Sequence, residues 1–211
     1  DIYDAKGNFS SWDSDGDGLY GEWYMGESAE DIAIDLIPDV AVGRLPCRSE
    51  KEVRTMVRKI ISYETSVDNE PWFSTILVAA GDTYPQTSNA NWTGYEGEYY
   101  GDRAIENMSG FTPTRLYTSD KSFTNKEDVI QEFRNGWGFV YFVGHGSPRQ
   151  WGNNAPNGSD FIQGPNCNDM WRFRNKERLP VCVVSGCHNS QFDVCLIRLF
   201  NPRTRWNQKN V

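Results

Sequence analysis

The sequence has 211 residues and a formal net charge of −8, and its aromatic content of 14% includes eight Trp. This length and composition fit a globular chain with a substantial core, and they exclude a disordered one. The acidic balance argues against a nucleic-acid partner, because binding to phosphates needs a basic surface. No apolar run has the length of a transmembrane helix, so we expect no integral membrane segment.

Residues 1–38 are acidic, aromatic and Gly-rich, and we expect them to end a preceding subdomain. Within them, alternating carboxylates followed by glycine resemble the start of a calcium-binding loop. The EF-hand pattern then fails, because its twelfth position is Tyr24 rather than Glu. The alternative is a solvated acidic turn, but crowded carboxylates without a cation repel each other. We therefore expect a structural Ca²⁺ held by Asp13, Asp15, Asp17 and Glu22.

Residues 39–211 are expected to form one further subdomain that is truncated at its C-terminus. Apolar residues 40–43 predict a short strand. Ser49 and Glu52 form a capping box, and apolar positions from Val53 to Ile61 at helical spacing predict a helix that ends near Glu64. A continuous apolar run over residues 75–80 predicts a strand that is covered on both faces.

A polar loop is expected over residues 81–97, followed by a weaker helix over 98–108 and a strand over 114–117. Thr124 and Glu127 suggest a second capping box before another helix. Residues 139–143 and 181–185 predict two more strands, separated by a long loop over 147–165 and a short amphipathic piece near 169–174. This alternation of strands and helices predicts an α/β domain with parallel strands, which binds ligands at the carboxyl ends of its strands.

Two of those strand ends carry reactive side chains beside glycine, namely His145 and Cys187. A thiolate attacks carbonyl carbon, and an imidazole accepts the thiol proton and later protonates the leaving amine. Asp82 follows a third strand and is the candidate group that orients the ring. The backbone N–H groups of Gly146 and Cys187 are candidates for an oxyanion hole. The competing base, His188, is adjacent to Cys187 and would point to the opposite side of an extended segment.

The plainer alternative is that Cys187 is a small packed residue, because buried thiols are common in cores. The five cysteines, an odd number, leave at least one unpaired within the chain. A third interpretation is a metal site, although the spacing does not match the CxxC pairs of structural zinc sites. Its ligands would be Cys182, Cys187, His188 and Cys195.

Four segments, in order, resemble the gingipain family of cysteine endopeptidases (peptidase family C25, caspase-like clan). The first resembles a conserved block of that family, the second falls where its acidic triad member lies, and the last two resemble its catalytic-histidine and catalytic-cysteine motifs. They are Ile37–Pro46, Leu77–Asp82, Val143–Ser147 with Trp151, and Ser185–Phe192.

The resemblance implies a caspase-like three-layer α/β/α sandwich with a mostly parallel sheet, and a cysteine endopeptidase acting on protein or peptide substrates. It assigns Cys187 as nucleophile, His145 as general base and acid, and Asp82 as the orienting group. Known gingipains cleave after basic residues, and Glu96 and Glu98 lie in the region of the substrate-binding acid, Glu98 being the better positional match. Trp151 is a further candidate substrate contact.

The resemblance also implies calcium as a stabilising ion, with no cofactor required for the chemistry, and an extracellular or cell-surface location. Four Asn-x-Ser/Thr sequons mildly favour export as well. The abrupt start and end suggest that the chain is a piece of a longer precursor. The alternative function is a catalytically inactive, calcium-stabilised surface or structural module of the same fold.

Overall fold

The structure is a computed structural model that describes residues 13, 16, 18, 40–66, 70–85 and 94–191. The chain divides into two units, residues 1–45 and 46–211, and the second contains all the described helices and strands. The helices are α1 (Glu50–Ser66), α2 (Glu96–Asn107) and α3 (Lys126–Glu132). The strands are β1 (Thr75–Ala80), β2 (Thr112–Tyr117), β3 (Phe139–Val143), β4 (His145–Gly146), β5 (Gln150–Asn154), β6 (Phe161–Asn166) and β7 (Val181–Ser185).

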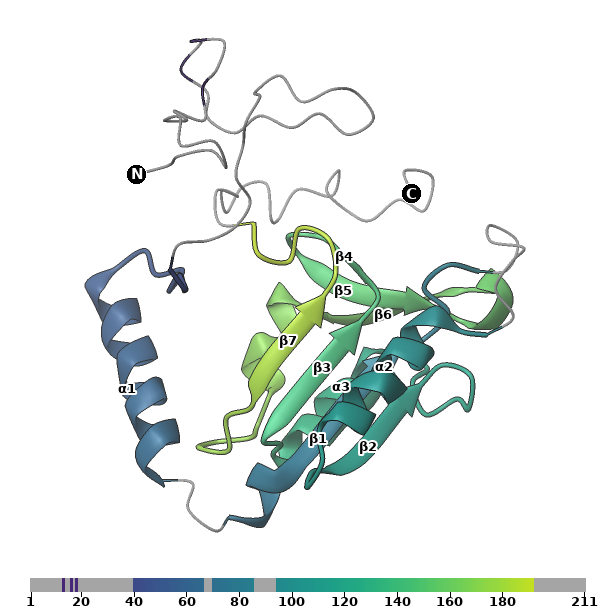
Figure 1. The fold of residues 1–211 in the computed structure, drawn as a ribbon, viewed down its shortest axis with the longest axis horizontal. Helices are drawn as coiled ribbons and strands as arrows, with labels where there is room; N and C mark the ends of the chain where they lie inside the picture. Colours follow the sequence, from purple (N-terminus) through teal and green to yellow (C-terminus); the bar gives the residue numbers. More distant parts are fainter. Residues whose placement is uncertain are drawn as a thin grey trace, which may run out of the picture. The chain divides into compact units, whose positions relative to one another are not determined.

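Four strands form the main sheet in the order β2-β1-β3-β7, and each neighbouring pair is parallel (Figure 1). The predicted strands over 75–80, 114–117, 139–143 and 181–185 are therefore confirmed, the second starting two residues earlier. Parallel neighbours need crossover connections, and α2 and α3 supply two of them. Because all four strands run the same way, their carboxyl ends meet at one edge of the sheet.

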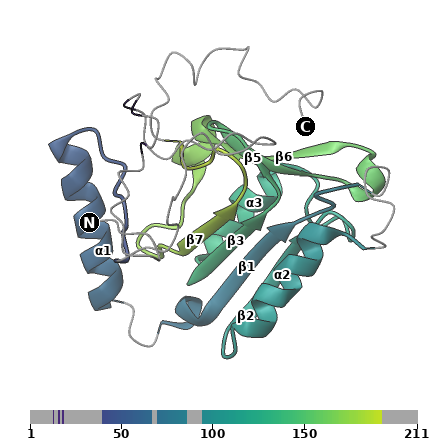
Figure 2. The same cartoon turned by 45° about the horizontal axis from the view of Figure 1, so that its top comes forward.

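Side-chain alternation along β1 divides the core into two clusters, one on each face of the sheet. Ile76 and Val78 pack with Val143 on the face that Ile105 of α2 adjoins. Leu77 packs on the opposite face, among residues that include Val129 of α3. Figure 2 shows α2 and α3 on opposite sides of the sheet. The result is a three-layer α/β/α sandwich, in which each fully buried aliphatic side chain contributes about 1.5–3 kcal/mol.

The segment expected to be a long loop over residues 147–165 instead contains β5 and most of β6, which pair antiparallel in a second sheet of order β4-β5-β6. The sequence did not predict these strands because Gly, Asn and Pro, which are frequent in this segment, have a low propensity for β-strands. Tertiary packing overrides this preference. The Trp151 ring stacks on Phe142 at 4.7 Å and on Phe123 at 5.4 Å between ring centroids, which fixes the hairpin above the main sheet.

The predicted N-termini of two helices are formed with small differences. At α1, Ser49 Oγ accepts the Glu52 N–H at 3.3 Å, as predicted, while Glu52 accepts the N–H of Arg48. At α3, the cap is one residue later than predicted, because the Asn125 side chain pairs with Asp128 in a reciprocal capping box. Asn caps a helix as well as Thr does or better, so the one-residue shift is inexpensive.

Residues 41–47 form no strand, contrary to the prediction for 40–43. Val42 has 85% of its surface exposed, and no strand pairs with this segment among the described residues. An apolar alternation becomes a strand only where a neighbour completes the hydrogen bonds. The apolar face of α1 is also exposed among the described residues, at Val53, Val57, Ile60 and Ile61. Within the described ranges, no helix combines the length and apolar content needed to cross a bilayer.

Candidate active site

The three candidate residues Asp82, His145 and Cys187 each follow one of three adjacent parallel strands, β1, β3 and β7. Val143 of β3 pairs with Ser185 of β7, so His145 and Cys187 each lie two residues beyond a paired position. On its other side β3 pairs with β1 as far as Ala79 and Phe142, and Asp82 and His145 each follow that last pair by three residues. His145 itself belongs to β4 and pairs with Gly152 of the second sheet. Parallel strands lie roughly 4.8 Å apart. The strand order therefore places the end of β3, which the candidate base follows, between the strand ends that the candidate carboxylate and the candidate nucleophile follow.

The loops that follow β3 and β7 are in contact beyond the sheet. The N–H of Gly144 donates to the carbonyl of Ser185 at 3.0 Å. Asn189 Nδ2 donates to the carbonyl of Ser147 at 3.1 Å. Cys187 is exposed, whereas His145 is only 8% exposed. A nucleophile must be accessible and its base must be held in place, and these two loops carry an exposed thiol and a buried imidazole.

A backbone carbonyl orients the ring of His145. Its Nε2 lies 2.6 Å from the carbonyl oxygen of Thr83, which can only accept a hydrogen bond. In the neutral ring the proton is therefore on Nε2, and Nδ1 is the nitrogen able to accept a proton. The ring of Tyr84 meets the imidazole edge to face, with 5.7 Å between centroids. Thr83 and Tyr84 escaped the sequence analysis, since no side-chain pattern marks a residue that acts through its backbone.

Asp82 is fully buried, and the structure ties it to the hairpin. Its Oδ2 accepts the N–H of Asn157 at 2.8 Å, and its own N–H donates to the carbonyl of Asn154. Burial raises the pKa of Asp82 to about 6; the Asn157 hydrogen bond opposes this, and the neighbouring Glu96 adds to it. The role of Asp82 in orienting His145 stays a prediction, because His145 Nε2 donates to the carbonyl of the next residue, Thr83.

We expect Asp82→Asn to change the pH dependence of stability. A raised carboxyl pKa means that the folded state holds the proton more tightly, so the stabilisation is complete below about pH 4 and is lost as pH rises through 6. Asn keeps the acceptor for the Asn157 N–H and never ionises. Relative to the variant, the wild type should lose about 2 kcal/mol of unfolding free energy between pH 4 and pH 8.

Urea unfolding at pH 4, 6 and 8 measures this difference. Asp160→Asn, at an exposed carboxylate, is the matched control and should show no such trend. If the free energies of unfolding of wild type and Asp82→Asn changed with pH in parallel, the raised pKa of the Asp82 carboxyl would be contradicted.

Two further buried carboxylates, Glu96 and Glu98, lie at the start of α2. Glu98 accepts hydrogen bonds from the backbone and hydroxyl of Ser119 and from the hydroxyl of Thr118. Burial raises the Glu98 pKa, and these hydrogen bonds oppose the rise. Glu96 accepts the N–H of Tyr84 through one oxygen, and its other oxygen is buried without a hydrogen-bond partner in the structure.

The unpartnered Glu96 oxygen belongs to a small group of buried acceptors. Asp82 Oδ1 and Thr83 Oγ1 are also buried and lack a partner in the structure. Two ionised carboxylates cannot satisfy each other, whereas a single proton between Asp82 and Glu96 would make a hydrogen bond. Glu96 thereby favours the protonated form of Asp82. A cationic side chain entering here would also find acceptors that are already desolvated.

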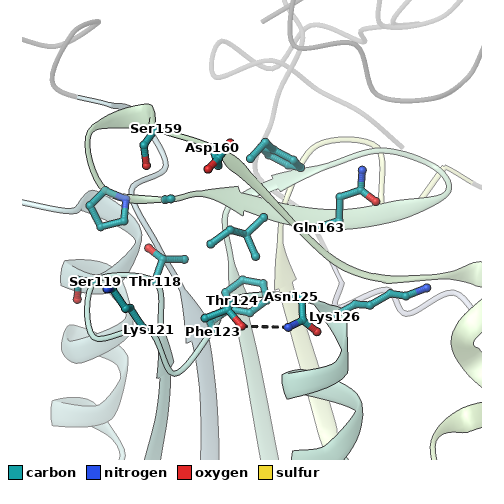
Figure 3. Close-up of a pocket in the computed structure, with 14 residues that line it drawn as sticks. Thr118, Ser119, Lys121, Phe123, Thr124, Asn125, Lys126, Ser159, Asp160 and Gln163 are labelled. Carbon is teal, nitrogen blue, oxygen red and sulfur yellow. Dashed lines mark hydrogen bonds between the residues drawn. The ribbon is translucent and has the colours of Figure 1, made fainter.

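Trp151 lies in the core, only 4% exposed, rather than on an open surface. It borders a cavity of about 710 Å³ that also reaches Ser147 and Asn189. A second cavity, of about 820 Å³, lies between the β5–β6 connection and the loop that leads into α3 (Figure 3). The carbonyl of Asn154 connects Asp82 to Thr118, which lines this second cavity, because it accepts from both the Asp82 N–H and the Thr118 hydroxyl.

Of the candidate calcium ligands, Asp13 is described, whereas Asp15, Asp17 and Glu22 lie outside the described residues. The Asp13 carboxylate accepts the N–H groups of Gly16 and Gly18, at 2.8 and 3.2 Å. Gly18 has φ +89°, a conformation that glycine adopts readily. It occupies the sixth position of the loop, where calcium loops need glycine for a sharp turn, so the described part fits the ion.

The zinc interpretation finds no support in the described part of the chain. Cys182, Cys187 and His188 are described, and no group of three or more His, Cys, Asp or Glu side chains there is arranged to hold a metal ion. Cys195, its fourth proposed ligand, lies outside the described residues. His188 is exposed and has φ 57°, in the left-handed region that a non-glycine residue seldom occupies.

Comparison with known proteins finds relatives that match most of the sequence. The family model of peptidase family C25 matches residues 7–200. An uncharacterised protein of Archaeoglobus fulgidus is 28% identical over an alignment of 183 positions, which covers 80% of this chain and 41% of that protein. Gingipain R2 of Porphyromonas gingivalis is 24% identical over 164 residues, which are 76% of this chain and 20% of that protein.

Solved structures agree on the fold. The crystal structure of the Arg-specific cysteine proteinase gingipain R superposes with a TM-score of 0.53 at 19% identity, and covers 69% of this chain and 31% of that one. The complex of gingipain pro- and mature domains also gives 0.53. The chain thus spans less than half the length of these relatives. Since the family model matches nearly the whole sequence, the chain belongs to peptidase family C25, a family of cysteine peptidases.

Proposed function

We propose that this chain carries the catalytic dyad of a cysteine endopeptidase, with Cys187 as nucleophile and His145 as general base and acid. One observation carries the proposal: the β3–β7 register gives His145 and Cys187 equal positions beyond adjacent strand ends. Membership of family C25 supports the same chemistry. The chain covers only part of the length of its relatives. We therefore propose the peptidase activity for the complete protein that contains this dyad.

The geometry supports the following reaction. His145 Nδ1 takes the thiol proton of Cys187, while the Thr83 carbonyl keeps the ring oriented through Nε2. The thiolate sulfur attacks the carbonyl carbon of the peptide bond, and the N–H groups of Gly146 and Cys187 are our candidates to stabilise the oxyanion. Nδ1 then returns the proton to the leaving amine. Water, deprotonated by the same nitrogen, hydrolyses the thioester and releases the thiol.

We assign the acid that recognises the substrate to Glu96 rather than to Glu98. Glu98 is already occupied by Ser119 and Thr118, whereas one buried oxygen of Glu96 has a hydrogen bond only when Asp82 is protonated. Glu96 also holds the N–H of Tyr84, whose ring lies against His145. A basic side chain before the cleaved bond would supply the missing positive charge. The similar gingipain R is described as Arg-specific, which agrees with an acidic residue that recognises the substrate.

The proposed function also includes a location, a longer precursor and a structural ion. We propose export or a cell-surface location, as the resemblance to gingipains implies. We also propose assembly with further parts of a longer precursor, which agrees with the complex of pro- and mature domains of a similar gingipain. We propose Ca²⁺ as a structural ion at the Asp13 loop, where it would screen the clustered carboxylates. The dyad chemistry itself requires no metal.

An active-site-directed electrophile tests the proposal. A peptide acyloxymethyl ketone with Arg at the recognised position should label Cys187, as mapped by mass spectrometry, faster than it labels the exposed Cys167. We expect at least about 100-fold preference, because only a thiol activated by a base reacts quickly at neutral pH. Glu96→Gln should reduce labelling by the Arg reagent and spare labelling by a reagent with Leu at the same position.

Equal labelling of Cys187 and Cys167 would contradict the dyad and would favour the inactive structural module. Rapid labelling of Cys187 with no preference for Arg would keep the peptidase assignment and remove the role of Glu96.

A further inference from the structure

We propose that Asn189 is the positioning residue that holds the Cys187 loop against the His145 loop; this inference rests on the proposed dyad. Its Nδ2 donates to two carbonyls of the segment that follows His145, that of Ser147 at 3.1 Å and that of Gln150 at 3.4 Å. The ladder between β3 and β7 ends at Val143 and Ser185. Beyond that point, Asn189 ties together the two loops that carry the dyad.

The amide of Asn189 lies where two glycines leave room for it. A Cβ atom on Gly146 would lie 2.0 Å from Asn189 Oδ1, and one on Gly186 would lie 2.6 Å from the same oxygen. Real Cβ atoms do not approach other atoms so closely, so both loops depend on glycine for this contact. Gly146 directly follows His145, and Gly186 directly precedes Cys187. The side chain therefore lies between the backbones that place the dyad.

The turn after Cys187 brings Asn189 back towards the sheet. His188 takes the left-handed conformation, and its carbonyl accepts the N–H of Gln191 at 3.2 Å. That conformation costs a non-glycine residue roughly 1–2 kcal/mol and persists only where neighbouring contacts enforce it. The two hydrogen bonds of Asn189 are such contacts. Because only His188 separates Asn189 from Cys187, a shift of this side chain moves the thiol.

Loss of the two Asn189 hydrogen bonds should reduce the effect of the His145 imidazole on the Cys187 thiol more than it reduces the stability of the fold. A misplacement of about 1 Å between reacting groups can cost on the order of 100-fold in rate. The readout is a double-mutant cycle on the alkylation rate of Cys187 by iodoacetamide at pH 7, followed by mass spectrometry of the Cys187 peptide. The four proteins are the wild-type chain, His145→Ala, Asn189→Ala and the double variant.

We expect His145→Ala to slow alkylation about tenfold in the wild-type background and less than about twofold in the Asn189→Ala background. Asn189→Asp has nearly the same size and no donor, so it should lose the coupling too, and it serves if Asn189→Ala does not fold. Asn175→Ala is the matched control, since its Nδ2 also donates to one loop carbonyl, that of Arg178 at 2.8 Å. It should keep the full tenfold effect.

A His145 effect that survives in both Asn189 variants would overturn this inference and leave the proposed peptidase standing. Coupling that depends on Asn189, in a protein that cleaves no peptide, would support the inference and overturn the proposed activity. No effect of His145→Ala in the wild-type background would overturn both, because there would be no dyad to position.

Discussion

Replacing Cys187 by Ala is expected to abolish hydrolysis of an unbiased peptide library, lowering kcat/KM by about 10⁴-fold or more. The sulfur is the proposed nucleophile, and it follows by two residues the last β7 position that pairs with β3. His145→Ala should cost about 10³-fold, because an unassisted thiol remains a weaker nucleophile. Cys187 is exposed, so we expect its variant to unfold within about 0.5 kcal/mol of the wild type.

His188→Gly is the control that separates the two histidines. Glycine accepts φ 57° without cost, so the variant should fold at least as well as the wild type and retain activity within about twofold. Library cleavage followed by mass spectrometry measures all three variants. Activity lost in His188→Gly and kept in His145→Ala would reverse the assignment of the base.

Much of the site followed from local sequence features combined with one topological rule. The apolar runs ending at Ala80, Val143 and Ser185 predict strands, and parallel strands bring their carboxyl ends to one edge. The first of these strands is buried, whereas the one that ends at Ser185 is exposed. The separation of 42 residues between His145 and Cys187 equals that between the paired Val143 and Ser185. The sequence shows this spacing, but only the observed register shows that His145 and Cys187 follow paired residues of adjacent strands.

Other parts of the site depend on contacts that sequence patterns do not encode. Thr83 holds His145 through a carbonyl oxygen, which every residue type possesses. The β5–β6 hairpin forms because Trp151 packs on Phe142, although the surrounding residues favour turns. Glu98 matched the expected position of the substrate acid, but the nearby hydroxyls of Ser119 and Thr118 occupy it. Such non-local partners decide which of two similar carboxylates remains available to a ligand.

Gly146→Ala is expected to have the second largest effect, on activity and stability together. The added methyl would lie 2.0 Å from Asn189 Oδ1 and 2.4 Å from the carbonyl oxygen of Cys187. A side chain can move aside, but the Cys187 backbone cannot move without shifting the thiol. We expect a loss of about 2–3 kcal/mol in unfolding free energy and about 100-fold in kcat/KM. Urea unfolding and peptide hydrolysis measure the two effects.

The two close contacts of the added methyl group separate the possible causes of a loss of activity. Ala keeps the backbone N–H of residue 146, so a loss of activity does not come from deleting an oxyanion donor. Combining Gly146→Ala with Asn189→Ala removes the first clash and leaves the second, so the double variant should not recover activity. Gly43→Ala, where nothing lies within 4 Å of the added atom, should change stability by less than about 0.5 kcal/mol. Wild-type activity in Gly146→Ala would show that the two loops do not need their close approach, and the alignment of His145 with Cys187 would lose its functional meaning.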